Sequence, residues 1–145
     1  MKNSIETLII PAAGMGMRLL PISKVIPKEM LRLVDKPVIY YIVKEAYLSG
    51  IRNVVIVINP WKKSIEKYLS DKNGNSLIAE FPDMHFSFVK TENFFGDGYA
   101  INLAKKMVKG NFFAVSMAYL LSPHIEEPFL KLFIQAYTKS GKPFI

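Results

Sequence analysis

The feature that most restricts the fold of this chain is a regular alternation of short apolar runs with segments of helical periodicity. Runs rich in β-branched and aromatic residues predict strands at Thr7–Ile10, Asn53–Ile58, His85–Lys90 and Phe112–Met117. Helical patterns are found at positions 38–46, Lys62–Leu69, Tyr99–Val108 and Pro128–Thr138. Strands that alternate with helices are typical of a layered α/β domain, so we expect a mostly parallel sheet.

Glycines and polar segments support these bounds. Gly50 follows the first helical pattern and the last pattern stops near Gly141, as expected of residues that end helices with φ > 0. We expect Asp97 or Gly98 to cap the third helix. In a parallel sheet the loops that follow the strands share one edge, so they are expected to converge. These loops are 11–31, 59–61 and 91–98.

Composition narrows the choice of partners. A chain of 145 residues that is 50% apolar can form one compact domain, and its net charge of +7 favours an anionic partner. Most lysines, including Lys62 and Lys63, occur at spacings that suit solvated helix faces, without a basic–aromatic repeat typical of nucleic-acid binding. The chain has no cysteine and no apolar run long enough to cross a bilayer. We expect a cytoplasmic protein with a small phosphorylated ligand and no nucleic-acid or membrane partner.

The loop between the first predicted strand and the first predicted helix carries the strongest functional signal. It combines two glycines with three cationic residues: Gly14, Gly16, Arg18, Lys24 and Lys28. Glycines let backbone N–H groups approach a phosphate and permit φ > 0, and the cations could surround a triphosphate. The glycine spacing alone fits neither the dinucleotide-binding fingerprint nor the P-loop, and two glycines in such a turn are often only structural. The whole loop nevertheless indicates nucleotide chemistry.

The longer string around this loop resembles a known family. Its parts are Ala12-Ala13-Gly14-x-Gly16-x-Arg18, Pro21-x-Ser23-Lys24, Pro27-Lys28-Glu29-Met30-Leu31 and Asp35-Lys36-Pro37. It is similar to the sugar-1-phosphate nucleotidyltransferases, above all to the bacterial UTP–glucose-1-phosphate uridylyltransferases. The likeness is close over the first seventy residues and thinner afterwards.

The resemblance implies a three-layer Rossmann-like nucleotidyltransferase fold and a site for UTP and a sugar 1-phosphate. An oxygen of the sugar phosphate attacks the α-phosphorus of the nucleotide, and pyrophosphate leaves. Arg18 and Lys28 would be the catalytic cations, because such a transfer needs positioning and charge neutralisation more than a covalent nucleophile. The nucleotide-binding positions would be Ala12, Ala13, Gly14, Gly16, Arg18, Lys24, Lys28, Gly96 and Gly98.

Several positions depart from the family pattern. The resemblance implies Mg²⁺ held by an aspartate after the fourth strand, but Ala118 stands there and offers no ligand oxygen. Thr91 or a neighbour replaces the glutamine that recognises the base, so the identity of the base stays open. Met17 and Arg32 replace a threonine and a proline in the first loop.

Family enzymes are about twice as long as this chain. We therefore expect a single nucleotide-binding domain over residues 1–145, without a C-terminal sugar-binding half. Two interpretations remain open, a uridylyltransferase with impaired or absent turnover and a catalytically silent nucleotide-binding module with a regulatory or assembly role. We also expect a homo-oligomer, with Tyr119–Leu121 and Phe129–Phe133 as candidate apolar contact patches.

Overall fold

The computed structural model describes residues 5–70, 80–110, 113–115 and 127–142. The strands of the main sheet are β1 (Thr7–Ala12), β4 (Asn53–Ile58), β5 (His85–Lys90) and β6 (Phe113–Val115). Their order in the described sheet is β5-β4-β1-β6, and all neighbouring strands are parallel. Thr7 lies opposite both Asn53 and Phe113, so the strands start level with one another. Their carboxyl ends therefore meet at one edge.

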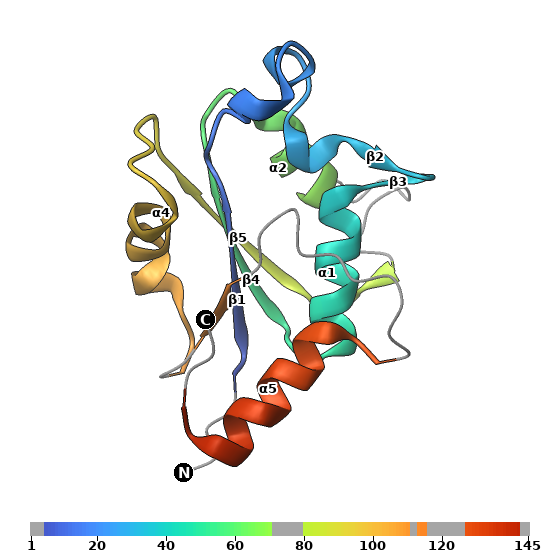
Figure 1. Cartoon of the computed structure of the whole chain (residues 1–145), viewed down its shortest axis with the longest axis vertical. Coiled ribbons are helices and arrows are strands. Elements are labelled where there is room, and N and C mark those ends of the chain that lie inside the picture. Colours follow the sequence, from blue (N-terminus) through green and yellow to red (C-terminus); the bar gives the residue numbers. More distant parts are fainter. Residues whose placement is uncertain (1–4, 71–79, 111–112, 116–126, 143–145) are drawn as a thin grey trace.

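Helices cover both faces of this sheet (Figure 1). The helices α1 (Val38–Leu48), α2 (Lys63–Ser70) and α5 (Phe129–Ser140) lie on one face, and α4 (Asp97–Ala104) lies on the other. The arrangement is the predicted three-layer α/β fold with a parallel sheet. No helix in the described ranges combines the length and the apolar character needed to cross a membrane.

The alternation of side chains along β1 explains the three layers. Leu8 and Ile10 belong to the larger core cluster, with residues of α1 and α2, whereas Ile9 belongs to the smaller cluster beneath α4. Successive strand residues point to opposite faces, so an uninterrupted apolar strand must be covered on both sides. Ala100 and Ala104 are the α4 residues buried in the smaller cluster, and their short side chains let the helix lie close to the sheet.

The carboxylate of Glu45 connects two helices on the larger face. It accepts a hydrogen bond from the backbone N–H of Leu130 at 2.9 Å, near the start of α5. The first N–H groups of a helix have no partner within the helix, so this bond fixes the start of α5 against α1.

The strand predictions agree closely with the structure. β4 and β5 have the predicted bounds, whereas β1 continues two residues further, through Pro11 and Ala12. The prediction ended early because proline is uncommon inside strands. For the last strand the structure shows β6 at Phe113–Val115, and the other predicted positions lie outside the described residues.

The helix predictions needed small corrections at their starts. Gly50 and Gly141 have φ of 87° and 65°, as expected of residues that end α1 and α5. α4 begins at Asp97 rather than Tyr99 and continues into a 3₁₀ turn, η4 (Lys105–Met107). The prediction that Asp97 or Gly98 caps this helix was wrong. Gly96 is the cap, and Asp97 places its charge in the first turn, where the helix dipole favours an anion.

Candidate functional site

The connection from β1 to α1 leaves the carboxyl edge of the sheet and folds into a series of tight turns. They are η1 (Met17–Leu19), η2 (Ile22–Lys24) and η3 (Lys28–Met30), followed by the antiparallel hairpin of β2 (Arg32–Leu33) and β3 (Lys36–Pro37). The N–H of Leu19 donates to the carbonyl of Gly16, and the N–H of Met30 donates to the carbonyl of Pro27, both at 2.8 Å. The sequence pattern predicted a loop here but not these turns.

The backbone at Gly16 requires glycine. Its φ is 69°, in the left-handed region that L side chains rarely adopt. A Cβ added here would lie 3.2 Å from the Cβ of Ser23 and 3.8 Å from the Cβ of Lys28. The turn at Gly16 therefore brings the beginning of the loop against Lys28, and any side chain at this position would separate them.

The three loops predicted to converge at the carboxyl edge are in contact. A Cβ at Gly14 would lie 3.3 Å from the ring of Phe94, so the loop after β5 packs against the loop after β1. The side-chain amide of Asn59 donates to the carbonyl of Glu92 at 3.5 Å, which joins the loops after β4 and β5. The convergence inferred from topology is confirmed.

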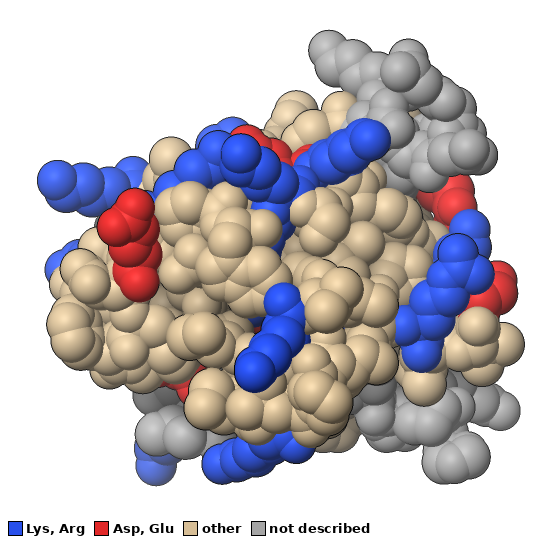
Figure 2. Space-filling view, turned by 90° about the horizontal axis from the view of Figure 1, so that it is seen from above, with Lys and Arg blue, Asp and Glu red and all other residues tan. Residues whose placement is uncertain are grey.

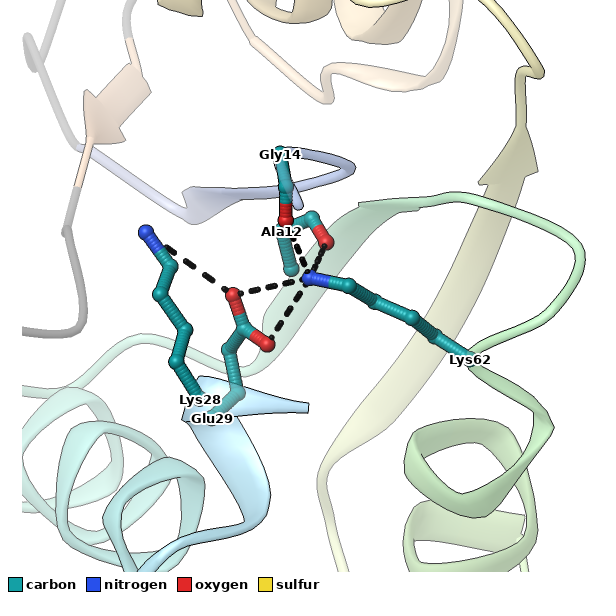
Figure 3. Close-up of polar contacts among 5 residues, drawn as sticks. All are labelled: Ala12, Gly14, Lys28, Glu29 and Lys62. Atoms are coloured by element: carbon teal, nitrogen blue, oxygen red, sulfur yellow. Dashed lines mark hydrogen bonds and ion pairs between the residues drawn. The ribbon is translucent and has the colours of Figure 1, made fainter. Parts of the chain in front are cut away.

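The third connection is a buried ion pair between Lys62 and Glu29 (Figure 3). The Nζ of Lys62 donates to the carbonyls of Ala12 and Gly14, both at 2.7 Å, and to the two carboxylate oxygens of Glu29 at 3.0 and 3.3 Å. Only 1% of either side chain is exposed. Two carbonyls and a carboxylate around one nitrogen suit the three donors of an ammonium group. Burial lowers the pKa of Lys62, and the charge of Glu29 opposes that effect.

The expectation that Lys62 lies on a solvated helix face was wrong. Lys62 precedes the first residue of α2 and shares its buried side with Ile65 and Leu69, whereas Lys63 is exposed. The spacing of three and seven residues from Lys62 to those two apolar residues was a usable signal of burial. Glu29 was also missed, because nothing local in the Pro-Lys-Glu-Met segment distinguishes a buried carboxylate from an exposed one.

The predicted cationic residues lie around the same loop. Arg18 in η1 and Lys24 in η2 are exposed, and neither forms an ion pair with another described residue. Lys28 is partly exposed, with its Nζ 4.0 Å from an oxygen of Glu29. Figure 2 views the molecule from this end and shows Lys and Arg side chains distributed around the face, with uncharged residues between them. These charges can meet an anionic ligand without first breaking a short ion pair.

The second glycine segment lies next to the first loop through Phe94. Gly96 has a φ of 94°, whereas no positive φ is found at Gly98, in the first turn of α4. A Cβ at either position would meet no atom within 4 Å. Thr91 closes a local turn, because its hydroxyl donates to the carbonyl of Asn93 at 2.9 Å and accepts from the N–H of Asn93 at 3.2 Å.

A second polar cluster lies near the hairpin. The hydroxyl of Tyr40 donates to Glu80 at 2.7 Å, and Lys36 approaches the same carboxylate at 3.4 Å. The hydrogen bond to Glu80 is the main reason that the pKa of Tyr40 is raised to about 12. The bond from Tyr40 likewise lowers the pKa of Glu80, because it favours the ionised carboxylate.

Two features predicted from the sequence lie outside the described residues. They are Ala118, which stands where a metal-binding aspartate was expected, and the apolar patch Tyr119–Leu121. Among the described residues, no group of three or more His, Asp or Glu side chains could hold a metal ion. The donor set that the structure does show therefore does not fit a bound Mg²⁺.

Comparison with known proteins agrees with this architecture. UTP–glucose-1-phosphate uridylyltransferases of Mycoplasma genitalium and Mycoplasma pneumoniae are 40% and 39% identical to the chain. The alignments cover 97% and 94% of this chain but only 53% and 51% of the two relatives. The chain thus spans about half the length of the curated relatives that it matches.

Solved structures give the same result. A UDP-glucose pyrophosphorylase complexed with UDP-glucose is 36% identical, with a TM-score of 0.80 over 94% of this chain and 54% of that one. A UTP-bound enzyme of the same name from Acinetobacter baumannii is 32% identical, with a TM-score of 0.82 over 95% of this chain. The model of the nucleotidyl transferase family matches residues 7–143. With its parallel sheet, its glycine-containing loop and a match over nearly its whole length, the chain belongs to the nucleotidyl transferase family.

Proposed function

We propose that this chain binds a nucleoside triphosphate, UTP first among them, with its phosphates against residues 14–18. One observation carries the proposal. The backbone N–H groups of Ala13, Gly14 and Met15 donate no hydrogen bond to any other described residue, although Ala13 is buried. Buried backbone donors are almost always paired, so a run of N–H groups without a partner beside free cations suits an anionic ligand.

The cations around the loop would then divide the work by their chemistry. Arg18 carries a planar guanidinium that can bond two phosphate oxygens at once, whereas Lys28 supplies a point charge on a flexible stem. Lys24, on the next turn, would add charge further along the triphosphate. Gly96 and Gly98 would leave room for the base and sugar, because a Cβ at either position would meet open space.

The relatives are named for transfer of a uridylyl group to glucose 1-phosphate, and the solved neighbours bind UTP or UDP-glucose. We propose that these residues form the nucleotide side of such a site. In that reaction an oxygen of the sugar phosphate forms a bond to the α-phosphorus of UTP, the bond to pyrophosphate breaks, and the negative charge moves to the leaving group. Arg18 and Lys28 would stabilise that charge.

Nucleotidyltransferases typically use a divalent metal, but no step is derived through one here. The described residues hold no fitting donor set, and Ala118 has no oxygen to offer. This position favours the second candidate function, a nucleotide-binding module with little or no turnover. The two candidates separate in one experiment on the 145-residue chain, in which UTP binding is measured by calorimetry and pyrophosphate release is measured with UTP, glucose 1-phosphate and Mg²⁺.

Binding without release would support the silent module, and binding with release at an ordinary enzymatic rate would establish the uridylyltransferase. Absence of UTP binding at millimolar concentration would refute both. We further propose that the chain self-associates in the cytoplasm through the exposed side of α5, where Leu132 and Phe133 are 37% and 38% exposed.

A further inference from the structure

Lys62 joins the two ends of the nucleotide loop. Ala12 is the last residue of β1 and Gly14 lies at the start of the loop, whereas Glu29 lies in η3 near its end. The Nζ of Lys62 contacts all three, and Figure 3 shows it between them. The side chain comes from the loop after β4, so it ties the nucleotide loop to a neighbouring strand.

The contacts with Ala12 and Gly14 determine which way the loop N–H groups point. A trans peptide unit is planar, and its carbonyl and N–H point in opposite directions. Because the carbonyls of Ala12 and Gly14 point to Lys62, the N–H groups of Ala13 and Met15 point away from it. These are the N–H groups that bond to no other described residue.

Lys62 cannot itself reach a ligand. Its side chain is 1% exposed and its nitrogen is surrounded by two carbonyls and the carboxylate of Glu29. Glu29 balances its charge, so Lys62 adds little net field at the surface. Lys28, the residue before Glu29, keeps a partly exposed side chain and remains available as the cation on the ligand side.

We propose that Lys62 is a positioning residue for nucleotide binding, which holds the carbonyls of Ala12 and Gly14 so that the N–H groups of Ala13 and Met15 face the phosphates. The proposal rests on the proposed function, since it concerns the same loop. It assigns Lys62 a role that differs from plain stabilisation. A structural ion pair could be replaced by apolar side chains without loss of function, whereas a clamp on the carbonyls could not.

The test compares Lys62→Met with the double variant Lys62→Met/Glu29→Met. The single change leaves the carboxylate of Glu29 buried without its partner, and we expect a large loss of thermal stability. The double change removes both charges at similar side-chain volume, and buried ion pairs replaced in this way are often no less stable. We expect the double variant to regain most of the lost melting temperature but to bind UTP at least tenfold more weakly than the wild type.

The matched control is Lys131→Met/Glu127→Met. This pair is exposed on α5 and its start, with the nitrogen 3.3 Å from the carboxylate, and the same two residue types are replaced. We expect its UTP affinity to equal that of the wild type. A folded double variant at Lys62 and Glu29 that binds UTP as tightly as the wild type would overturn the proposal, because the pair would then be structural only.

Two further measurements apply if the double variant does not fold or the wild type does not bind UTP. In the wild type, a UTP titration followed by amide NMR should shift the signals of Ala13 and Met15 most, and binding without these shifts would refute the proposed orientation. In the absence of nucleotide, hydrogen exchange over residues 11–20 should be at least tenfold faster in the folded variants that lack Lys62. Unchanged exchange would refute the clamp, whereas a wild type without UTP affinity would refute only the proposed function.

Discussion

Replacement of three glycines by alanine separates the effects of backbone conformation and crowding. Gly98 has no positive φ and open space around a Cβ, Gly50 has a φ of 87° and open space, and Gly16 has a φ of 69° and a close neighbour. The neighbour of Gly16 is the Cβ of Ser23 at 3.2 Å, and Ser23 is 2% exposed, so it has little room to move.

The expected changes in unfolding free energy follow from these surroundings. Gly98→Ala, inside a helix, should stabilise the protein by about 0.5–1 kcal/mol. Gly50→Ala should cost about 1–2 kcal/mol, the cost of the left-handed region for an L residue. Gly16→Ala should cost about 2–4 kcal/mol, because crowding against Ser23 adds a further cost to that of the backbone.

Urea unfolding measures all three values, provided that the m-value stays constant between variants. UTP affinity of the Gly16→Ala protein should also fall, since a side chain at this position pushes Ser23 and Lys28 away from the turn. The reasoning would be refuted if Gly16→Ala and Gly50→Ala had equal effects, because crowding would then contribute nothing. It would equally be refuted if Gly16→Ala had the stability of the wild type.

Three other predictions concern charge, ionisation and assembly. Arg18→Ala should weaken UTP binding by about 1.5–3 kcal/mol in calorimetry, the usual contribution of a charge-assisted hydrogen bond, whereas Lys139→Ala on α5 should not. The pKa of Tyr40 is raised to about 12, so its contribution to stability is complete below pH 10 and is lost as the pH rises through 12. The pH dependence of unfolding in that range should therefore be smaller in Tyr40→Phe, and equal profiles would contradict the assignment. Light scattering should show self-association that Phe133→Ser weakens, and a monomeric wild type at high concentration would exclude it.

The sequence predicted the layers of this fold because its strands are continuous apolar runs. The bounds of β4 and β5 follow directly from β-branched and aromatic residues, and the parallel order follows from the intervening helices. The turns η1 to η3 could not be predicted in this way, because their side chains show no period and their shape depends on Gly16 and on contacts with distant residues.

The candidate site was predicted only in part for the same reason. Gly14, Gly16 and Lys28 form a contiguous signal in the sequence, and the structure brings Gly16 and Lys28 together. Lys62 was missed because its partners are backbone carbonyls, which no residue type announces. Glu80 was missed because its contact with Tyr40 spans forty positions and leaves no local pattern.

The buried pair of Lys62 and Glu29 also bears on the order in which the protein folds. Ala12, Glu29 and Lys62 are far apart along the chain, and they meet only when β4 has paired with β1. A peptide that contains β1 and the whole nucleotide loop, but ends before β4, would lack the lysine that fixes the loop. The site is therefore a late product of folding, because its shape depends on a long-range contact rather than on the local sequence.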